Sequence, residues 1–161
     1  MRLLLKNVLF SLLVPGVVAV GLPLMLARGR PMAACPLLLA LGVGLLGIGV
    51  ATYIWCVWDF AAFGRGTPLP LDAPRRLVTR GLYRHTRNPM YLGVLCMAAA
   101  WPAIFASSWH LAYAAGLALT FQLFVVAYEE PRLRELFGVD YDVYRRTVPR
   151  WFPRPRRRTP G

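Results

Sequence analysis

The chain has 161 residues, of which 57% are hydrophobic and only 16% are charged. Its mean hydropathy is positive, so the remaining residues cannot supply the polar surface of a soluble domain. A net charge of +12 would suit nucleic acid only if basic residues were interleaved with polar or aromatic ones on a folded surface, whereas here they lie between apolar segments. We therefore predict one membrane domain over residues 1–161, with no nucleic-acid partner.

Four apolar segments each approach the roughly 20 residues with which an α-helix crosses about 30 Å of hydrocarbon. They cover residues 8–27, 36–58, 90–107 and 111–128. A helix satisfies its own backbone groups, which lipid cannot do. The sequence thus predicts an all-α polytopic transmembrane bundle of four spanning helices, followed by a cytosolic C-terminal amphipathic helix. Pro15, Pro23 and Pro102 are expected to kink their helices.

The charged residues predict the orientation. With a cytosolic N-terminus, every Lys and Arg except Arg28 and Arg30 lies on the cytosolic side, together with all seven acidic residues. This distribution follows the positive-inside rule and places both termini in the cytosol. A bacterial plasma (inner) membrane is the simplest location, because no targeting peptide is recognised. A cleaved signal ending near residues 32–35 fits less well, because a second apolar helix follows at once.

Two sequence features favour packing or surface roles over chemistry. Gly42, Gly44 and Gly47 match GxGxxG, but a dinucleotide site needs a strand and a turn before the helix. We expect instead a smooth packing face made of Ala40, Gly44, Gly47 and Ala51. The basic residues 150–158, including most of the tail 154–161, are expected to lie on anionic lipid headgroups.

No metal site is expected. His85 and His110 have no second ligand at a suitable spacing. The three cysteines lie in or beside apolar segments without a CxxC spacing and are expected to be reduced. The sequence gives no signal for an oligomeric state.

The start of the third apolar segment carries the first polar cluster. Pro89 suits the first helical position and Asn88 is a favourable N-cap. The free N–H groups and the positive end of the helix dipole, with Arg84 and Arg87 nearby, predict a site for an anion such as a carboxylate. The alternative is a capped helix whose arginines reach toward lipid headgroups.

The second polar cluster is Glu129-Glu130-Pro131, after the fourth apolar segment. The short connection around residues 108–110 makes the last two segments an antiparallel pair, so this cluster returns to the start of the third helix. Adjacent carboxylates at a membrane boundary need cationic partners. Arg84 or Arg87 could serve, and so could a ligand ammonium or sulfonium. The amino-acid end of S-adenosylmethionine, with its carboxylate and ammonium, would use both clusters.

These motifs resemble a known family. The run Gly66-Thr-Pro, Leu77-Val-x-x-Gly81-x-Tyr83-Arg-x-x-Arg87-Asn-Pro-x-Tyr91-x-Gly93, Glu129-Glu130, Phe137-Gly-x-x-Tyr141-x-x-Tyr144 and Val148-Pro-Arg-Trp-x-Pro153 is similar to the isoprenylcysteine carboxyl methyltransferases and their phospholipid methyltransferase relatives. The resemblance covers residues 64–153, which would be the catalytic half.

The resemblance implies an integral membrane enzyme that uses S-adenosyl-L-methionine without a Rossmann fold or a metal. The residues that would bind the cofactor are Leu77, Val78, Tyr83, Asn88, Pro89, Met90, Tyr91 and Glu129. Glu129 would receive the cofactor's ammonium. We hypothesise catalytic roles for Arg87, as an electrostatic orienter, and for Glu130, as a second anchor. Tyr141 and Tyr144, three residues apart, could close the pocket from the cytosol.

Three positions depart from the family pattern. Asn88 stands where many members have His, and Leu82 stands where relatives often have Pro. Val125 stands where eukaryotic enzymes that methylate prenylated proteins carry an Arg associated with substrate. This last departure argues against a prenylated protein as the acceptor.

The sequence therefore predicts a membrane methyltransferase that acts on a lipophilic thiol, carboxylate, amine or phenol at the cytosolic face. The alternative is a small noncatalytic membrane protein that binds anionic lipid or stabilises a partner complex. A transporter is disfavoured, because no apolar segment carries a charge near its middle.

Overall fold

The computed structural model describes residues 15–60, 62 and 77–152. These residues are helical and contain no strand, which confirms the all-α prediction for this part of the chain. Predicted features at residues 8–14, at Gly66-Thr-Pro and in the tail 154–161 lie outside the described residues. The elements, in chain order, are η1 (Val17–Gly21), α2 (Leu22–Leu26), α3 (Pro36–Asp59), η3 (Gly81–Arg84), α4 (Pro89–Phe105), α5 (Ser108–Phe124), η4 (Val125–Glu129) and α6 (Glu130–Thr147).

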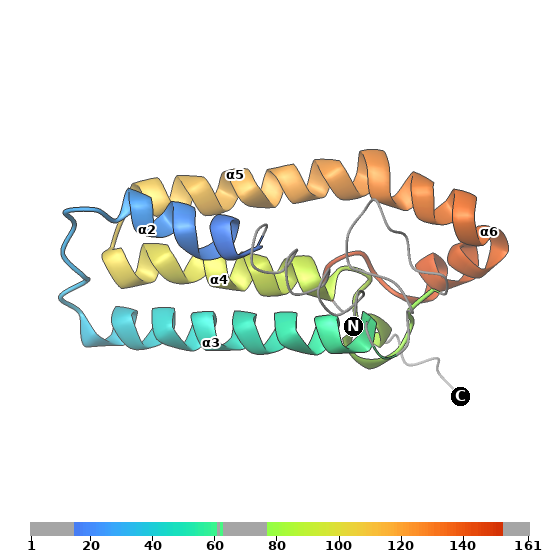
Figure 1. Ribbon diagram of the computed structural model, residues 1–161, viewed down its shortest axis with the longest axis horizontal. Helices are drawn as coiled ribbons and strands as arrows, with labels where there is room; N and C mark the ends of the chain where they lie inside the picture. Colours follow the sequence, from blue (N-terminus) through green and yellow to red (C-terminus); the bar gives the residue numbers. More distant parts are fainter. Residues whose placement is uncertain (1–14, 61, 63–76, 153–161) are drawn as a thin grey trace, which may run out of the picture.

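The helices α2, α3, α4 and α5 run along the long axis of the molecule, and α6 lies at one end (Figure 1). Within the described ranges, two helical segments are long and apolar enough to cross a membrane: α3, and the segment Ser108–Thr147 that comprises α5, η4 and α6. Val17–Leu26 and α4 are apolar but shorter. Membrane association is supported, and the count of four spanning helices stays a prediction.

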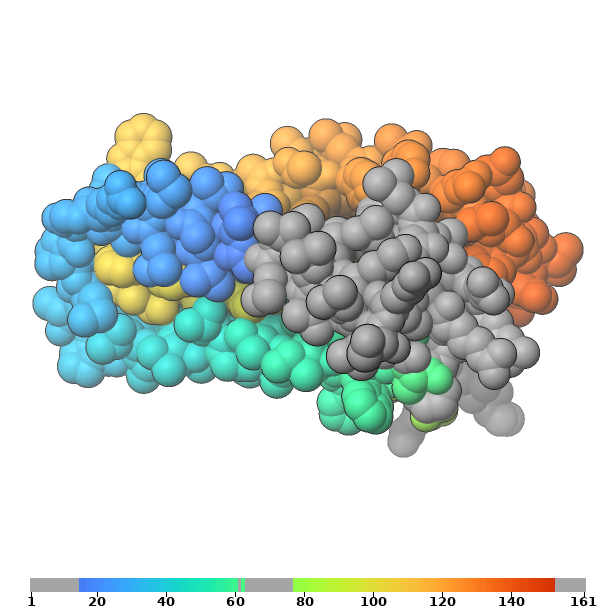
Figure 2. All heavy atoms as spheres, viewed as in Figure 1, coloured from blue at the N-terminus to red at the C-terminus, as the bar shows by residue number. Residues whose placement is uncertain are grey.

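The central helix of the described bundle is α4, which contacts α3, α5 and η1. Its buried residues include Val94, Met97, Trp101 and Ile104. In the space-filling view only a narrow part of α4 shows between α2 and α3 (Figure 2). The apolar core therefore forms around α4, and both polar clusters adjoin its first turn or the helix paired with it.

Close contact between α3 and α4 depends on glycines. A Cβ on Gly49 would lie 2.6 Å from the carbonyl oxygen of Gly93, and a Cβ on Gly42 would lie 2.5 Å from Cγ1 of Ile104. Around Gly44 and Gly47 the added Cβ would meet nothing within 4 Å. The predicted packing face was therefore wrong: α3 packs through residues seven apart, about two helical turns, and Ala40, Gly44, Gly47 and Ala51 face away from α4.

Pro23 explains how the N-terminal segment is held. Proline has no N–H, so the carbonyl four residues earlier, on Ala19, lacks its helical donor. The indole Nε1 of Trp101 donates to that carbonyl at 2.7 Å. Nearby, the Tyr113 hydroxyl donates to the Val18 carbonyl at 2.7 Å, and His110 Nε2 lies 3.0 Å from the Pro23 carbonyl oxygen. Side chains of α4 and α5 thus satisfy the irregular backbone around η1.

The helix α6 consists of two arms joined at Gly138, whose φ of 49° lies in the left-handed region that favours glycine. Figure 1 shows the second arm turning back toward the bundle. An ion pair joins the arms, with Arg134 Nε 3.2 Å from Asp142 Oδ1. The bend brings Tyr141 and Tyr144 against the segment that precedes α4.

The glycine contacts generate a paired prediction. Gly49→Ala should destabilise the bundle by about 1–3 kcal/mol, because the added methyl group overlaps backbone atoms of α4. Gly47→Ala should leave stability unchanged or raise it slightly, because the site is open and alanine favours helix. Thermal unfolding in detergent checks both. A similar midpoint for the two variants would contradict the packing described here.

Candidate functional site

Glu129 and Tyr91 join the two polar clusters. The Tyr91 hydroxyl donates a hydrogen bond of 2.8 Å to Glu129 Oε2 across 38 residues of sequence. The contact arises because α4 and α5 form an antiparallel hairpin, as the short connection predicted. Glu129 ends η4, a π-helical turn, and such turns are frequent at functional sites. The acidic pair therefore does lie beside the first turn of α4.

Glu130 is paired with two arginines. Arg150 donates to both of its oxygens, from Nε at 2.6 Å and from Nη2 at 2.9 Å. Arg87 Nη1 lies 3.0 Å from Glu130 Oε1. Burial alone would raise the pKa of Glu130, but the hydrogen bonds from Arg150 and the positive charges of Arg87, Arg150 and Arg145 lower it overall. The prediction of Arg87 as a partner is confirmed. The prediction that Arg150 lies on lipid headgroups is wrong.

Glu129 has a different environment. Across residues 15–60, 62 and 77–152 no cation forms an ion pair with it, and its hydrogen-bond partner is the Tyr91 hydroxyl. Burial raises the pKa of Glu129, the Tyr91 hydrogen bond opposes this shift, and the neighbouring charge of Glu130 adds to it. Two adjacent carboxylates therefore differ sharply: one is neutralised by the protein, and the other would be stabilised by a cation that the described residues do not supply.

The start of α4 is held by the segment that follows α6. The backbone N–H of Arg87 donates to the Pro149 carbonyl at 2.9 Å. The carbonyl of Arg150 accepts hydrogen bonds of 3.0 Å from Thr86 Oγ1 and from Asn88 Nδ2. Asn88 occupies the N-cap position of α4 but makes no capping hydrogen bond with its side chain. The predicted helix start at Pro89 with Asn88 as the N-cap residue is confirmed, but the Asn88 side chain forms no cap hydrogen bond and its Nδ2 instead binds the returning chain.

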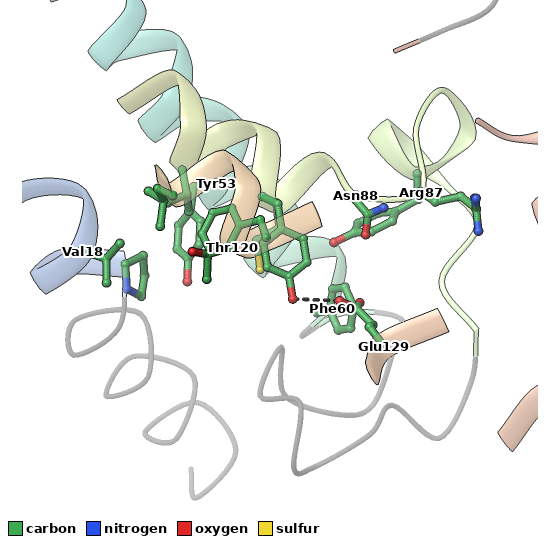
Figure 3. A pocket seen from close by; sticks show the side chains of 14 residues that line it. Val18, Tyr53, Phe60, Arg87, Asn88, Thr120 and Glu129 are labelled. Atoms are coloured by element: carbon green, nitrogen blue, oxygen red, sulfur yellow. Dashed lines mark hydrogen bonds between the residues drawn. The ribbon is translucent and has the colours of Figure 1, made fainter. Parts of the chain in front are cut away.

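A cavity of about 280 Å³ opens beside Glu129, close to the lower end of the range for small-molecule sites. Its polar end contains Tyr83, Arg87, Asn88 and Glu129. It continues between the helices to Leu117, twelve residues before Glu129 and therefore about 18 Å away along a helix. The lining is mostly apolar (Figure 3). The shape suits a ligand with one polar and one apolar part.

Six of the residues predicted for the site line this cavity: Tyr83, Arg87, Asn88, Met90, Tyr91 and Glu129. Glu130 lines a separate cleft beside α6. Val78 is buried against Cys56 and Tyr83, Pro89 is buried at the helix start, and Leu77 does not line the cavity. The guanidinium of Arg87 is turned away from the other labelled side chains of the cavity (Figure 3), toward Glu130 and Tyr141.

Tyr141 and Tyr144 contact the segment before α4 rather than lining the cavity. Arg87 Nη1 donates to the Tyr141 hydroxyl at 2.9 Å, and the buried Tyr144 hydroxyl donates to the Tyr83 carbonyl at 2.7 Å. They hold two cavity residues, Arg87 and Tyr83, in place from the α6 end of the bundle.

Sequence reasoning missed Tyr53, Phe60 and Thr120, which also line the cavity. The helical spacing could have indicated Tyr53, because it lies one turn after Gly49 and therefore on the face of α3 that packs on α4. In the described part of the chain, no group of three or more His, Cys, Asp or Glu side chains is placed to hold a metal ion.

A comparison with protein families matches residues 37–140 to the family model described as phospholipid methyltransferase. The matched stretch covers more than half of the chain, from the start of α3 to the bend in α6, and contains Arg87, Tyr91 and both glutamates. No curated protein matches, and no solved structure matches.

The two glutamates should respond oppositely to neutralisation. Because burial raises the pKa of Glu129, its ionised form opposes folding at pH values above its ordinary pKa of 4.5. Glu129→Gln should therefore raise the unfolding midpoint at pH 7 by a few degrees, the shift that about 1 kcal/mol gives in a chain of this size. The gain should disappear below pH 4.5.

Glu130→Gln should lower the midpoint at pH 7. The pKa of Glu130 is depressed, so its contribution to stability is present above its ordinary pKa of 4.5 and is lost as pH falls through the lower folded value. The difference from wild type should therefore shrink in acid. Thermal unfolding measured from pH 3 to pH 8 tests both variants, and destabilisation by Glu129→Gln at pH 7 would contradict the environments described here.

Proposed function

Since the chain belongs to the phospholipid methyltransferase family, whose members are membrane methyltransferases, we propose that it transfers a methyl group from S-adenosyl-L-methionine to a lipophilic acceptor. The reaction would take place at the cytosolic end of the bundle, in the cavity beside Glu129. The observation that carries the proposal is a carboxylate without a cationic partner among the described residues, at the polar end of a largely apolar cavity.

The described residues fit the amino-acid end of this cofactor. Glu129 has one oxygen bound to the Tyr91 hydroxyl, which orients the carboxylate and leaves it able to accept a hydrogen bond from an ammonium group. Arg87 lies at the rim of the cavity, and its buried Nε has no hydrogen-bond partner in the described ranges. Because its guanidinium is turned toward Glu130, we assign it a longer-range attraction for the cofactor's carboxylate.

When bound, S-adenosylmethionine supplies a methyl group on a positively charged sulfur. The protein's own task is then to align the acceptor with that group and to exclude water. Phe121, Leu117 and Val94 give the deeper cavity an apolar wall, along which a lipophilic acceptor can lie. The acceptor atom would be a thiol, carboxylate, amine or phenol oxygen. If it is an anion, charge is lost during transfer, so a dry site favours the reaction.

We further propose four spanning helices with both termini in the cytosol of a bacterial cell, the fourth span covering residues 111–128. The arginines support this orientation: the segment between α2 and α3, which carries Arg28 and Arg30, lies at the end of the bundle opposite α6 (Figure 1), and the other described arginines belong to α6 or to the segments before α4 and after α6. The basic tail would lie on anionic headgroups. A noncatalytic lipid-binding protein would need neither the cavity nor the environment of Glu129.

Cofactor binding tests the proposal. The protein in lipid nanodiscs should bind S-adenosylmethionine and S-adenosylhomocysteine, and Glu129→Gln should weaken both by about 10- to 100-fold, as expected for loss of a charge-assisted hydrogen bond of about 1.5–3 kcal/mol. Isothermal titration calorimetry measures both affinities.

The matched control is Glu135→Gln, on the exposed first arm of α6, where Glu135 pairs with Arg132. It should bind like wild type. Equal affinity in wild type and Glu129→Gln would refute the site, and no binding by wild type would favour the noncatalytic alternative. Methyl transfer to prenylcysteine analogues, small thiols and phosphatidylethanolamine then identifies the acceptor.

A further inference from the structure

The segment after α6 connects three parts of the site. We call residues 148–151 the C-terminal latch. Its carbonyls on Pro149 and Arg150 hold the start of α4, and Trp151 Nε1 donates to Gln122 Oε1 on α5 at 2.7 Å. The Arg150 side chain reaches the first residue of α6. The latch thus ties α4, α5 and α6 together at the polar end of the cavity.

The strongest contact of the latch is the two-bond pair between Arg150 and Glu130. Paired N–H groups on a planar guanidinium fix the orientation of a carboxylate as well as its charge. The side chains of Arg150 and Glu130 are only 32% and 16% exposed, so salt screens the pair less than it would screen a fully exposed one. The contact therefore holds Glu130 in one direction, away from the cavity that Glu129 lines.

Arg150 is one of two arginines that form an ion pair with Glu130, and Arg145 adds a further positive charge nearby. Glu129 and Glu130 carry two negative charges, and Arg87 and Arg150 carry two positive ones. Without Arg150, the carboxylate of Glu130 would keep Arg87 as its ion-pair partner, with Arg145 nearby, and would repel the ionised form of Glu129 more strongly. A ligand ammonium would then meet a site in which Glu129 is more readily protonated.

We propose that Arg150 is a positioning residue for the cofactor site: it holds and neutralises Glu130 through the latch, which leaves Glu129 as the carboxylate that binds a ligand's ammonium. This inference rests on the proposed function. The charged and titratable groups around Glu129 are Tyr91 on α4, Glu130 and Tyr141 on α6, and three further residues of the cavity wall: Tyr53, Tyr83 and Arg87. Of these groups only the two glutamates titrate in acid. The change in ligand affinity as pH falls therefore reports their ionisation.

The test is the affinity of S-adenosylhomocysteine measured by titration calorimetry from pH 4 to pH 8 in nanodiscs. Wild-type affinity should fall in acid as Glu129 becomes protonated. Arg150→Gln should weaken binding several-fold at neutral pH and move this acid midpoint upward by about half a pH unit, less than the roughly 1–3 units that a directly contacting charge produces. Arg150→Lys keeps the charge and should keep the wild-type midpoint.

The matched control is Arg146→Gln, which removes the same charge from an exposed position near the end of α6 and should shift nothing. If the latch had only a structural role, Arg150→Gln would lower the affinity by the same factor at every pH, and Arg150→Lys would not restore the wild-type affinity. Either result would overturn the proposal. If Arg150→Gln does not fold, Arg150→Lys decides: a wild-type midpoint supports the role of charge, and a raised midpoint contradicts it.

The proposed function and the role of Arg150 can be refuted separately. If wild type does not bind S-adenosylhomocysteine, the proposed function falls and the role of Arg150 falls with it. If wild type binds, Glu129→Gln does not, and Arg150→Gln keeps the wild-type midpoint, then only the role of Arg150 is wrong.

Discussion

The candidate site depends on the unequal partnering of two adjacent carboxylates. Glu130 binds two arginines, whereas Glu129 binds the Tyr91 hydroxyl. A half-buried carboxylate without a positive partner is costly, and a fold retains such a group readily when a ligand supplies the missing charge. The rest of the bundle can be understood as the scaffold that creates this difference and places it at one end of an apolar cavity.

Three devices produce the arrangement. The α4–α5 hairpin returns Glu129 to the first turn of α4, and the π-helical turn η4 lies just before Glu130, which begins α6. The bend at Gly138 then sends the second arm of α6 back toward the bundle, so that the latch reaches both Glu130 and the start of α4. Trp101 and Tyr113 secure the N-terminal segment, which contributes Val18 to the cavity, by donating to carbonyls around η1. These two hydrogen bonds satisfy carbonyl groups that lipid could not satisfy.

Much of this could be predicted from the sequence, because its strongest signals are local. Apolar segments and a short connection were enough to predict helices and to bring Glu129 to Tyr91. What the sequence could not supply was long-range pairing. Nothing in the pattern of glycines shows that Gly42 and Gly49, rather than Gly44 and Gly47, meet α4, since that depends on the rotation of α3. Likewise Arg150 looked like part of a basic tail, because only the bend at Gly138 brings it to Glu130. Asn88 does occupy the N-cap position, but the sequence could not show that its Nδ2 donates to the distant Arg150 carbonyl.

The most direct measurement is an experimental structure of the protein with S-adenosylhomocysteine in a lipid environment. The account predicts that the ligand's ammonium lies within hydrogen-bond distance of Glu129, with Glu130 still bound to Arg87 and Arg150. A ligand seated elsewhere, or a Glu129 sealed by a protein cation with no space beside it, would contradict the account.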